Sequence, residues 1–416
     1  MKPTTNDIIE TGNRPRGKYS GQFWLIFWGQ LISVGGTSIT WPFLTIYLRE
    51  QLGLPLATIT TLITLESAMT VLATIIVGPF MDRYGRRWVM IFSLFMNCVT
   101  FLLMSQASSL LEFAILMGVR GLFTPLFRVG TNTMVTDLTS EKDRYDAFSL
   151  SRTSANIGFA IGPAIGGFIA AVSFQLSLYI SASIMGIMTL LTLLLLKETL
   201  PNEVKRQPKS ARQEFIGYKR IFNDKIFLYF LLGDTFVMMA MVNMFNLLSV
   251  YSKENFGMPE SQYGFIMTVN AVMAASLQYP VTQFTKRYPV ALMLAIGAVF
   301  YAFGLGSVAF GNRFLHFALS MVIMTCGELI LMPMAMSLVS RLAPLELRGS
   351  YMGIYSLTMG AARGIGPLIG GVLNDQIAPA AIWYGGFVLG LISAGLFLLL
   401  DKKIRREEQP AITCSG

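Results

Sequence analysis

The sequence is short of charged residues. Asp, Glu, Lys and Arg make up 13% of its 416 positions, whereas hydrophobic residues make up 53%. Soluble domains contain about 25% charged residues, so this composition excludes an ordinary soluble enzyme and a disordered chain. A membrane-spanning helix needs about 20 mainly apolar residues, and roughly twelve such helices would fit within the chain. We therefore expect an all-α membrane protein.

Cysteine and histidine are equally scarce. The three cysteines, Cys98, Cys326 and Cys414, fit no disulfide framework, and the single histidine, His316, has no companions with which to bind a metal ion. The sequence contains no Gly-rich phosphate loop and no nucleophile–base pair. We therefore expect no metal, no cofactor and no enzymatic activity.

Apolar runs predict twelve spans in two sets of six. The first set covers 21–47, 56–80, 87–106, 109–135, 146–171 and 173–196, and the second covers 225–251, 260–285, 290–310, 313–339, 349–374 and 379–400. The implied domains are an N-terminal tail (1–20), a first bundle (21–196), a linker (197–224), a second bundle (225–400) and a C-terminal tail (401–416).

The distribution of positive charge predicts the orientation in the membrane. If both termini are cytoplasmic, 25 of the 32 Lys and Arg residues lie in cytoplasmic segments, 3 lie on the opposite side and 4 lie within spans. Cytoplasmic loops carry such an excess, so the net charge of +9 indicates topology rather than a nucleic-acid partner. The first residues lack the apolar region of a signal peptide. We expect a multi-pass protein of the inner or plasma membrane, with N and C termini inside.

The two halves repeat each other at an offset of 204 residues. This offset aligns Gly53 and Pro55 with Gly257 and Pro259. It also aligns Gly162-Pro163 and Gly166-Gly167 with Gly366-Pro367 and Gly370-Gly371. A duplication with an even number of spans places two bundles the same way up, with a cavity between them.

Ionisable residues inside spans are the main candidates for function, because each costs about 2.5–3.5 kcal/mol at the helix centre. They are Glu66, Arg120, Arg128, Arg152, Asp234, Glu328 and Arg363. For proton coupling we select Glu328 first, then Asp234, Glu66 and Arg120. For the substrate cavity we select Gln30, Glu66, Arg152, Asp234, Asn270 and Glu328. The alternative is that these acids and bases form static ion pairs.

The loop after the second span carries a recognisable motif. Residues 78–87 read Gly-Pro-Phe-Met-Asp-Arg-Tyr-Gly-Arg-Arg, which resembles the G-x-x-x-D-R-x-G-R-R/K signature of the major facilitator superfamily. The resemblance implies two six-helix bundles and a conformational latch. Its residues would be Gly78, Asp82, Arg83, Gly85, Arg86 and Arg87, and Asp137 resembles a gating acid. The alternatives are a solvated positive loop and, for Asp137, a solvated helix end.

Further motifs resemble the drug:proton antiporters of that family. Gly158, Gly162, Pro163, Gly166 and Gly167 are similar to the antiporter motif of the fifth span, although simple close packing of small residues also explains them. The stretch from Gly327-Glu328 to Pro333 resembles a tenth-span pattern whose acid takes part in cation recognition and proton exchange. Arg120 is similar to a fourth-span arginine tied to proton transfer, but Thr124 stands where a glycine is usual.

These features predict a secondary active transporter. We expect proton-coupled efflux of lipophilic or cationic drug-like compounds by alternating access, carried out by a monomer whose partners are the small-molecule substrate, protons and the lipid bilayer. The alternative is export of a metabolite, or flipping of a lipid, with an anionic head group that buried arginines would bind. A receptor or scaffold would need a substantial soluble domain, which the predicted spans leave no room for.

Overall fold

The computed structural model describes residues 19–140, 143–199, 221, 223–344 and 347–408, and in this part of the chain the regular structure is helical throughout. The first half contains α1 (Gly21–Thr40), η1 (Trp41–Phe43), α2 (Leu44–Leu52), α3 (Leu56–Tyr84), α4 (Arg86–Met104), α5 (Leu110–Leu138), α6 (Arg144–Val172) and α7 (Phe174–Leu195). The second half contains α9 (Lys225–Phe256), α10 (Glu260–Thr285), α11 (Val290–Val308), α12 (Phe314–Leu342), α13 (Arg348–Gln376) and α14 (Ala381–Glu408).

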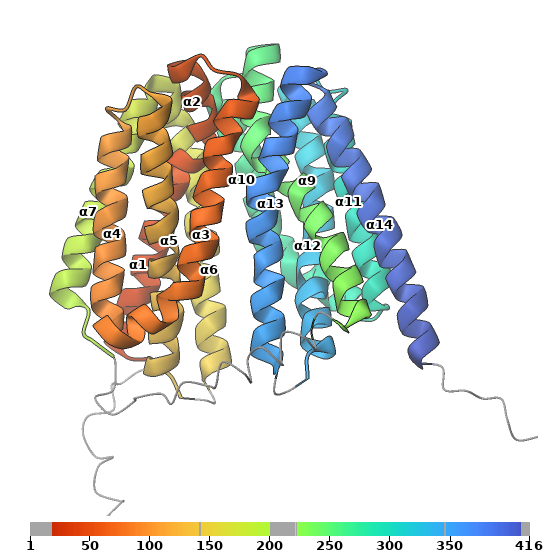
Figure 1. Cartoon of the computed structure of the whole chain (residues 1–416), viewed down its shortest axis with the longest axis horizontal. Coiled ribbons are helices and arrows are strands. Elements are labelled where there is room, and N and C mark those ends of the chain that lie inside the picture. Colours follow the sequence, from red (N-terminus) through yellow and green to blue (C-terminus); the bar gives the residue numbers. More distant parts are fainter. Residues whose placement is uncertain (1–18, 141–142, 200–220, 222, 345–346, 409–416) are drawn as a thin grey trace, which may run out of the picture.

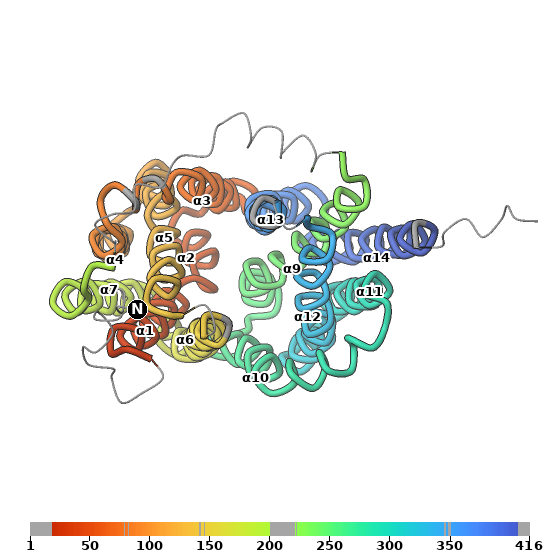
Figure 2. The backbone as a smooth tube through the Cα atoms, turned by 90° about the horizontal axis from the view of Figure 1, so that it is seen from below, coloured from red at the N-terminus to blue at the C-terminus, as the bar shows by residue number. Residues whose placement is uncertain are grey.

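The helices gather into two bundles, α1–α7 and α9–α14, which stand side by side (Figures 1 and 2). The bundles meet along two seams, where α3 packs against α13 and α6 packs against α10. The predicted fold of two six-helix bundles is therefore confirmed. We call the end that holds α2 the Arg49 end and the end that holds the α3–α4 turn the Arg86 end; Figure 1 shows the Arg49 end at the top.

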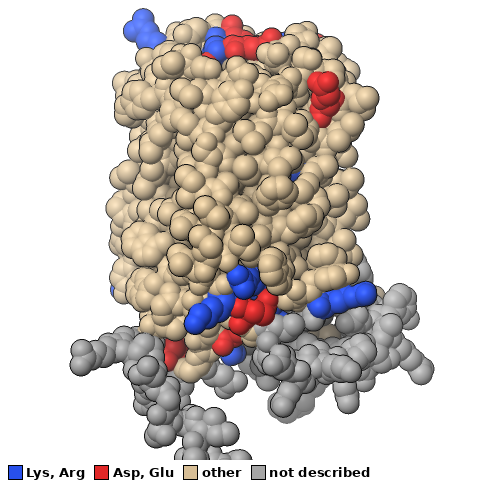
Figure 3. Space-filling view, turned by 90° about the vertical axis from the view of Figure 1, so that its left-hand side faces the viewer, with Lys and Arg blue, Asp and Glu red and all other residues tan. Residues whose placement is uncertain are grey.

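In the described chain, ten helices, with α1 to α2 counted as one, are long and apolar enough to cross a membrane. The two long helices that fall short on composition are α10 and α13. Both pack across the seams against the opposite bundle, so part of their surface meets protein rather than lipid and can carry small and polar residues. Figure 3 shows the matching outer surface, where charged atoms gather near the two ends and the broad band between them is almost without charge.

The internal repeat is visible in the backbone. Gly53 and Gly257, which are 204 positions apart, end α2 and α9 with nearly identical left-handed φ angles of 63° and 64°. The first span differs from its predicted range, 21–47, because the helix continues to Leu52 through the short 3-10 segment at Trp41–Phe43. Pro42 lies at the start of that segment, where the missing N–H of proline is tolerated.

Helix starts are fixed by local hydrogen bonds. At the start of α5, the Ser109 hydroxyl accepts from the Glu112 N–H at 3.3 Å, while the Glu112 carboxylate accepts from the Ser109 N–H at 3.1 Å. This reciprocal pair is a capping box, which satisfies two backbone donors at a helix N-terminus. Residues 1–18, 200–220 and 409–416, which include most of the predicted tails and linker, lie outside the described residues.

Candidate functional site: intramembrane acids, arginines and bundle seams

Two of the predicted acids lie in the second bundle and are held by neutral donors. Asp234 on α9 is 1% exposed, and the Thr358 hydroxyl donates to its Oδ2 at 3.1 Å. Its Oδ1 has no hydrogen-bond partner. Glu328 on α12 is partly exposed, and the Asn270 amide donates to its Oε2 at 2.8 Å. The structure therefore gives both carboxyl groups hydrogen bonds but no ion pair with a described cation.

The third acid, Glu66 on α3, lies in the first bundle with a cationic partner. Its Oε1 is 3.7 Å from Arg120 Nε, and the side chains are 19% and 2% exposed respectively. The Arg120 guanidinium also lies over the Phe101 ring, 5.0 Å from its centroid. The alternative of a static ion pair is therefore stronger for Glu66 and Arg120 than for Asp234 or Glu328.

The predicted cavity residues differ in how accessible they are. Gln30 is 8% exposed, and its Oε1 accepts from the Ser151 hydroxyl at 2.6 Å within the first bundle. Asn270 is 5% exposed and donates to Thr325 as well as to Glu328. The Arg152 side chain on α6, by contrast, is exposed. Gln30 and Asn270 are thus buried and hydrogen-bonded to neighbouring side chains, whereas the Arg152 side chain is accessible to a ligand.

The glycine stripe on α6 serves two different contacts. Gly158, Gly162 and Gly166 pack against the backbone of α1 in the same bundle; a Cβ at Gly166 would lie 2.2 Å from the Ile39 carbonyl oxygen. Gly167 instead faces α10 across the seam, where a Cβ would lie 2.8 Å from the Glu260 carbonyl oxygen. Pro163 of α6 also meets α10, since a Cβ at Gly264 would lie 2.8 Å from the Pro163 carbonyl oxygen. Close packing therefore explains three of the five motif residues, and contact between the bundles explains Pro163 and Gly167.

The second bundle repeats this division. Gly366 and Gly370 pack against α9 of their own bundle, while Gly371 faces α3 of the other, where a Cβ would lie 2.6 Å from Thr60 Oγ1. The contact between α3 and α13 changes along its length. It is close at Gly371 and at Gly360, where a Cβ would lie 2.7 Å from Val71, and between them the Thr64 hydroxyl donates to the Gly364 carbonyl at 2.7 Å. It leaves open space around Gly353, toward the Arg86 end.

At the Arg86 end, the α3–α4 turn is held within the first bundle. Gly85 has φ +90° and ψ 150°, a conformation that only glycine adopts readily. The Glu198 carboxylate accepts from the N–H groups of Arg86 and Arg87 at 3.0 and 3.1 Å. Asp137 Oδ2 lies 3.3 Å from Arg86 Nε. An acid at a helix N-terminus is favoured by the helix dipole, so Glu198 and Asp137 together fix the start of α4.

Other residues of the predicted latch have simpler surroundings. Arg83 lies beside the Tyr84 ring, 5.4 Å from its centroid, and Gly78 has open space around its Cα. The side chain of Asp82 lies outside the described part of the structure. A latch role for these residues stays a prediction.

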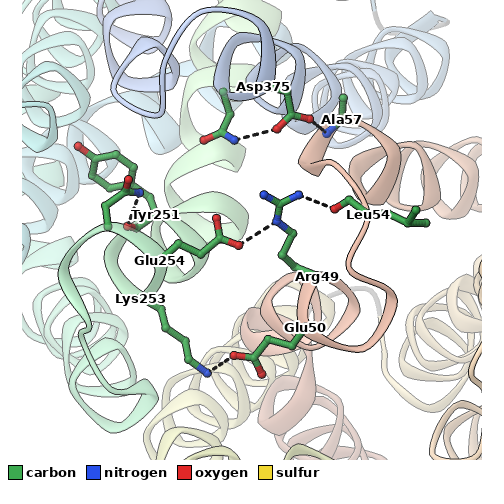
Figure 4. A network of polar contacts seen from close by, with 10 residues as sticks. Arg49, Glu50, Leu54, Ala57, Tyr251, Lys253, Glu254 and Asp375 are labelled. Atoms are coloured by element: carbon green, nitrogen blue, oxygen red, sulfur yellow. Dashed lines mark hydrogen bonds and ion pairs between the residues drawn. The ribbon is translucent and has the colours of Figure 1, made fainter.

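At the Arg49 end, charged residues from both bundles meet (Figure 4). Arg49 Nε lies 2.8 Å from Glu254 Oε1, and Lys253 Nζ pairs with Glu50 of α2 as well as Glu260. Asp375 Oδ2 accepts from the Ala57 N–H at 2.7 Å. These contacts hold the bundles together at this end.

Sequence reasoning missed this charged cluster, although the repeat contains its signal. The offset of 204 residues places Arg49-Glu50 on Lys253-Glu254. The base of each half pairs with the acid of the other, so the two ion pairs are equivalent copies. The contact of Glu198 with the start of α4 was missed as well, because its partner helix is more than a hundred residues away in the chain.

Two matching bundles with polar seams and an uncharged outer band define a polytopic membrane transporter. Residues 26–252 and 235–413 each match the description of the Major Facilitator Superfamily. The chain belongs to the Major Facilitator Superfamily. The predictions of this family and of a transporter rather than an enzyme are confirmed.

Several curated proteins are similar over most of the chain. The uncharacterized MFS-type transporter YqjV of Bacillus subtilis is 26% identical over 90% of this chain and 91% of its own length. A Na(+), Li(+), K(+)/H(+) antiporter of Planococcus maritimus is 24% identical over 91% and 90%. Multidrug resistance protein 2 of Bacillus subtilis is 25% identical over 78% and 82%. A crystal structure of peptide transporter POT in complex with sulfate shares the fold, with a TM-score of 0.78, 16% identity and coverage of 94% and 96%.

Proposed function

We propose that this protein is a proton-coupled antiporter that exports lipophilic, drug-like small molecules by alternating access. The Arg49 end faces outward and is closed, and the Arg86 end faces the cytoplasm. The excess of Lys and Arg in the segments at the Arg86 end supports this orientation. The relatives described as a multidrug resistance protein and a cation/proton antiporter support drug efflux and proton exchange respectively.

One observation carries the proposal: Asp234 and Glu328 lie deep in one bundle and have only neutral hydrogen-bond donors. Intramembrane acids of this kind mark proton relays and substrate pathways. Because neither carboxyl group forms an ion pair, each can take up or release a proton without separating a pair of charges. Glu328 is also partly exposed, so its carboxyl group is more accessible for proton exchange than that of Asp234.

The test uses the purified full chain in liposomes that contain a pH-sensitive dye. An inward proton gradient is imposed, and efflux of a lipophilic dye and movement of protons are recorded together. We expect Glu328→Gln to abolish coupled proton movement. Asp401→Asn, which removes an acid that pairs with Arg405 at the far end of α14, is the matched control. Proton movement that persists unchanged in both Glu328→Gln and Asp234→Asn contradicts the proposal.

A substrate with an anionic head group is the second candidate. It is favoured by three arginines, Arg128, Arg152 and Arg363, whose exposed side chains have no described ionic partner. Under this alternative the transport cycle and the proton site stay the same, and only the charge of the substrate differs.

A further inference from the structure

Three arginines at intramembrane depth are open and unpaired. Arg128 on α5, Arg152 on α6 and Arg363 on α13 all have exposed side chains, and the described residues give none of them a hydrogen bond or ion pair. Arg120, two turns from Arg128 on the same helix, shows the contrast, because it is 2% exposed and pairs with Glu66. The three exposed arginines therefore differ from Arg120, which is buried and has an acidic partner.

Two of these arginines, Arg128 and Arg363, lie on helices of opposite bundles that both pack against α3. Arg363 precedes Gly364, whose carbonyl accepts from Thr64 of α3 at 2.7 Å, so Arg363 lies at the seam between the bundles. Arg128 lies on α5 of the first bundle, and α5 packs against the same helix, α3. Glu66 is the acid nearby, and Arg120 already lies 3.7 Å from it. The helices that pack on this part of α3 therefore supply more cations than the acids described there: Arg120, Arg128 and Arg363 against Glu66.

The acids of the second bundle do not compensate for this excess. Asp234 is hydrogen-bonded to Thr358 and Glu328 to Asn270, and neither forms an ion pair with a described arginine. An unpaired charge within a membrane is unfavourable, and two guanidinium groups on either side of α3 also repel each other. An anion between them would relieve both costs.

The chemistry of arginine indicates which anion fits. The planar guanidinium group binds carboxylate and phosphate oxygens through two parallel hydrogen bonds, and its charge is permanent. We propose that Arg128 and Arg363 together bind an anionic group, such as a carboxylate, sulfonate or phosphate, on an amphipathic substrate.

This assignment deepens the proposed function, on which it rests, by naming the substrate class as amphipathic anions. It also links binding to motion. Because Arg128 and Arg363 belong to different bundles, an anion held by both would draw the bundles together. Binding energy is then available to drive the change between the two open states, since a ligand shifts such an equilibrium by its differential affinity for the two states.

The experiment compares two probes with the same aromatic core and opposite charge. Full-length protein in nanodiscs of zwitterionic lipid is titrated with fluorescein, an anion, and with tetramethylrhodamine methyl ester, a cation. We expect tighter binding of fluorescein, and a loss of about tenfold in its affinity in Arg128→Gln and in Arg363→Gln, since losing about 1.4 kcal/mol changes Kd tenfold. The Lys variants at both positions should retain part of the affinity. Arg405→Gln, at the exposed end of α14, is the control.

A lipid source of the anion is separated in a second arm. Nanodiscs containing phosphatidylglycerol should weaken fluorescein binding if a lipid head group occupies the same arginines, and should leave it unchanged if the site takes soluble amphiphiles. Unchanged melting temperatures show that the variants are folded. Preference for the rhodamine ester, or equal fluorescein affinity in wild type and both Gln variants, overturns the assignment.

The outcomes also separate this inference from the proposed function. Fluorescein binding that depends on Arg128 and Arg363, without any substrate-driven proton movement in liposomes, supports the anion site and contradicts proton antiport. Proton movement driven by the rhodamine ester alone supports antiport and contradicts the anion site.

Discussion

Reversing one charge at the Arg49 end should open that end of the protein. The variant is Glu254→Arg, which removes the ion pair with Arg49 and places two like charges together. The side chains of Arg49 and Glu254 are 26% and 39% exposed, so the pair is worth about 0.2–1 kcal/mol, as for other solvent-exposed pairs. Repulsion adds a similar amount. The combined effect of about 0.4–2 kcal/mol shifts the equilibrium between closed and open states by about 2- to 30-fold.

The shift can be measured as a distance between spin labels on the two bundles. Exposed Gln51, in the last turn of α2, and exposed Asn312, before α12, are replaced by labelled cysteines in a chain whose native cysteines are changed to serine. We expect Glu254→Arg to increase the population with the longer distance, and high salt to reduce the difference from wild type. The double variant Arg49→Glu with Glu254→Arg restores the pair in reverse. An unchanged distance distribution at low salt, or a double variant as open as the single one, refutes the reasoning.

Two further predictions concern glycines. Gly167→Leu and Gly371→Leu should also lengthen the label distance, because their side chains would meet the backbone of the opposite bundle at Glu260 and Ala57. Gly395→Leu, with open space around it, is the control and should leave the distance unchanged. Equal distances in all three variants would contradict the role of the seams. Gly85→Ala should lower the free energy of unfolding by about 1–3 kcal/mol, since φ +90° is strained for alanine and its Cβ would collide with Glu198. Thermal melting, with Gly395→Ala as the control, measures this effect. A melting temperature equal to that of the control would show that the turn adapts to the substitution.

The fold was predictable because hydrocarbon imposes simple rules on the sequence. Apolar runs of fixed length, the repeat at 204 residues and the 78–87 motif together identified two bundles and the family. The break at Trp41–Phe43 was not predicted, because a single proline in an apolar run leaves the length of the span unchanged. Pairings were harder still. Glu66 with Arg120 and Glu254 with Arg49 depend on which helices become neighbours, and a list of ionisable residues does not contain that information.

The ion pairs at the Arg49 end and the glycines at the seams have kept the symmetry of the repeat, whereas the charges in the interior have lost it. Arg49-Glu50 corresponds to Lys253-Glu254, and Gly167 corresponds to Gly371, in each case with the same type of residue in both halves. The interior positions instead match a charge in one half with a neutral residue in the other. The pairs are Asp234 with Gln30, Glu66 with Asn270, Glu328 with Thr124, Arg128 with Met332, Arg152 with Ser356 and Arg363 with Phe159.

The proposed function and the proposed anion site account for this difference. Closing one end needs both bundles to meet in the same way, so equivalent residues serve in both halves and each ion pair has a second copy. The loss of one copy leaves the other in place, and for this reason we expect Glu254→Arg to shift the equilibrium rather than abolish closure. Binding a proton and an anion at separate places needs one site for each. A duplicated set of charges would place like charges together near the axis between the bundles, whereas divergence puts unpaired acids in one bundle and most of the arginines in the other.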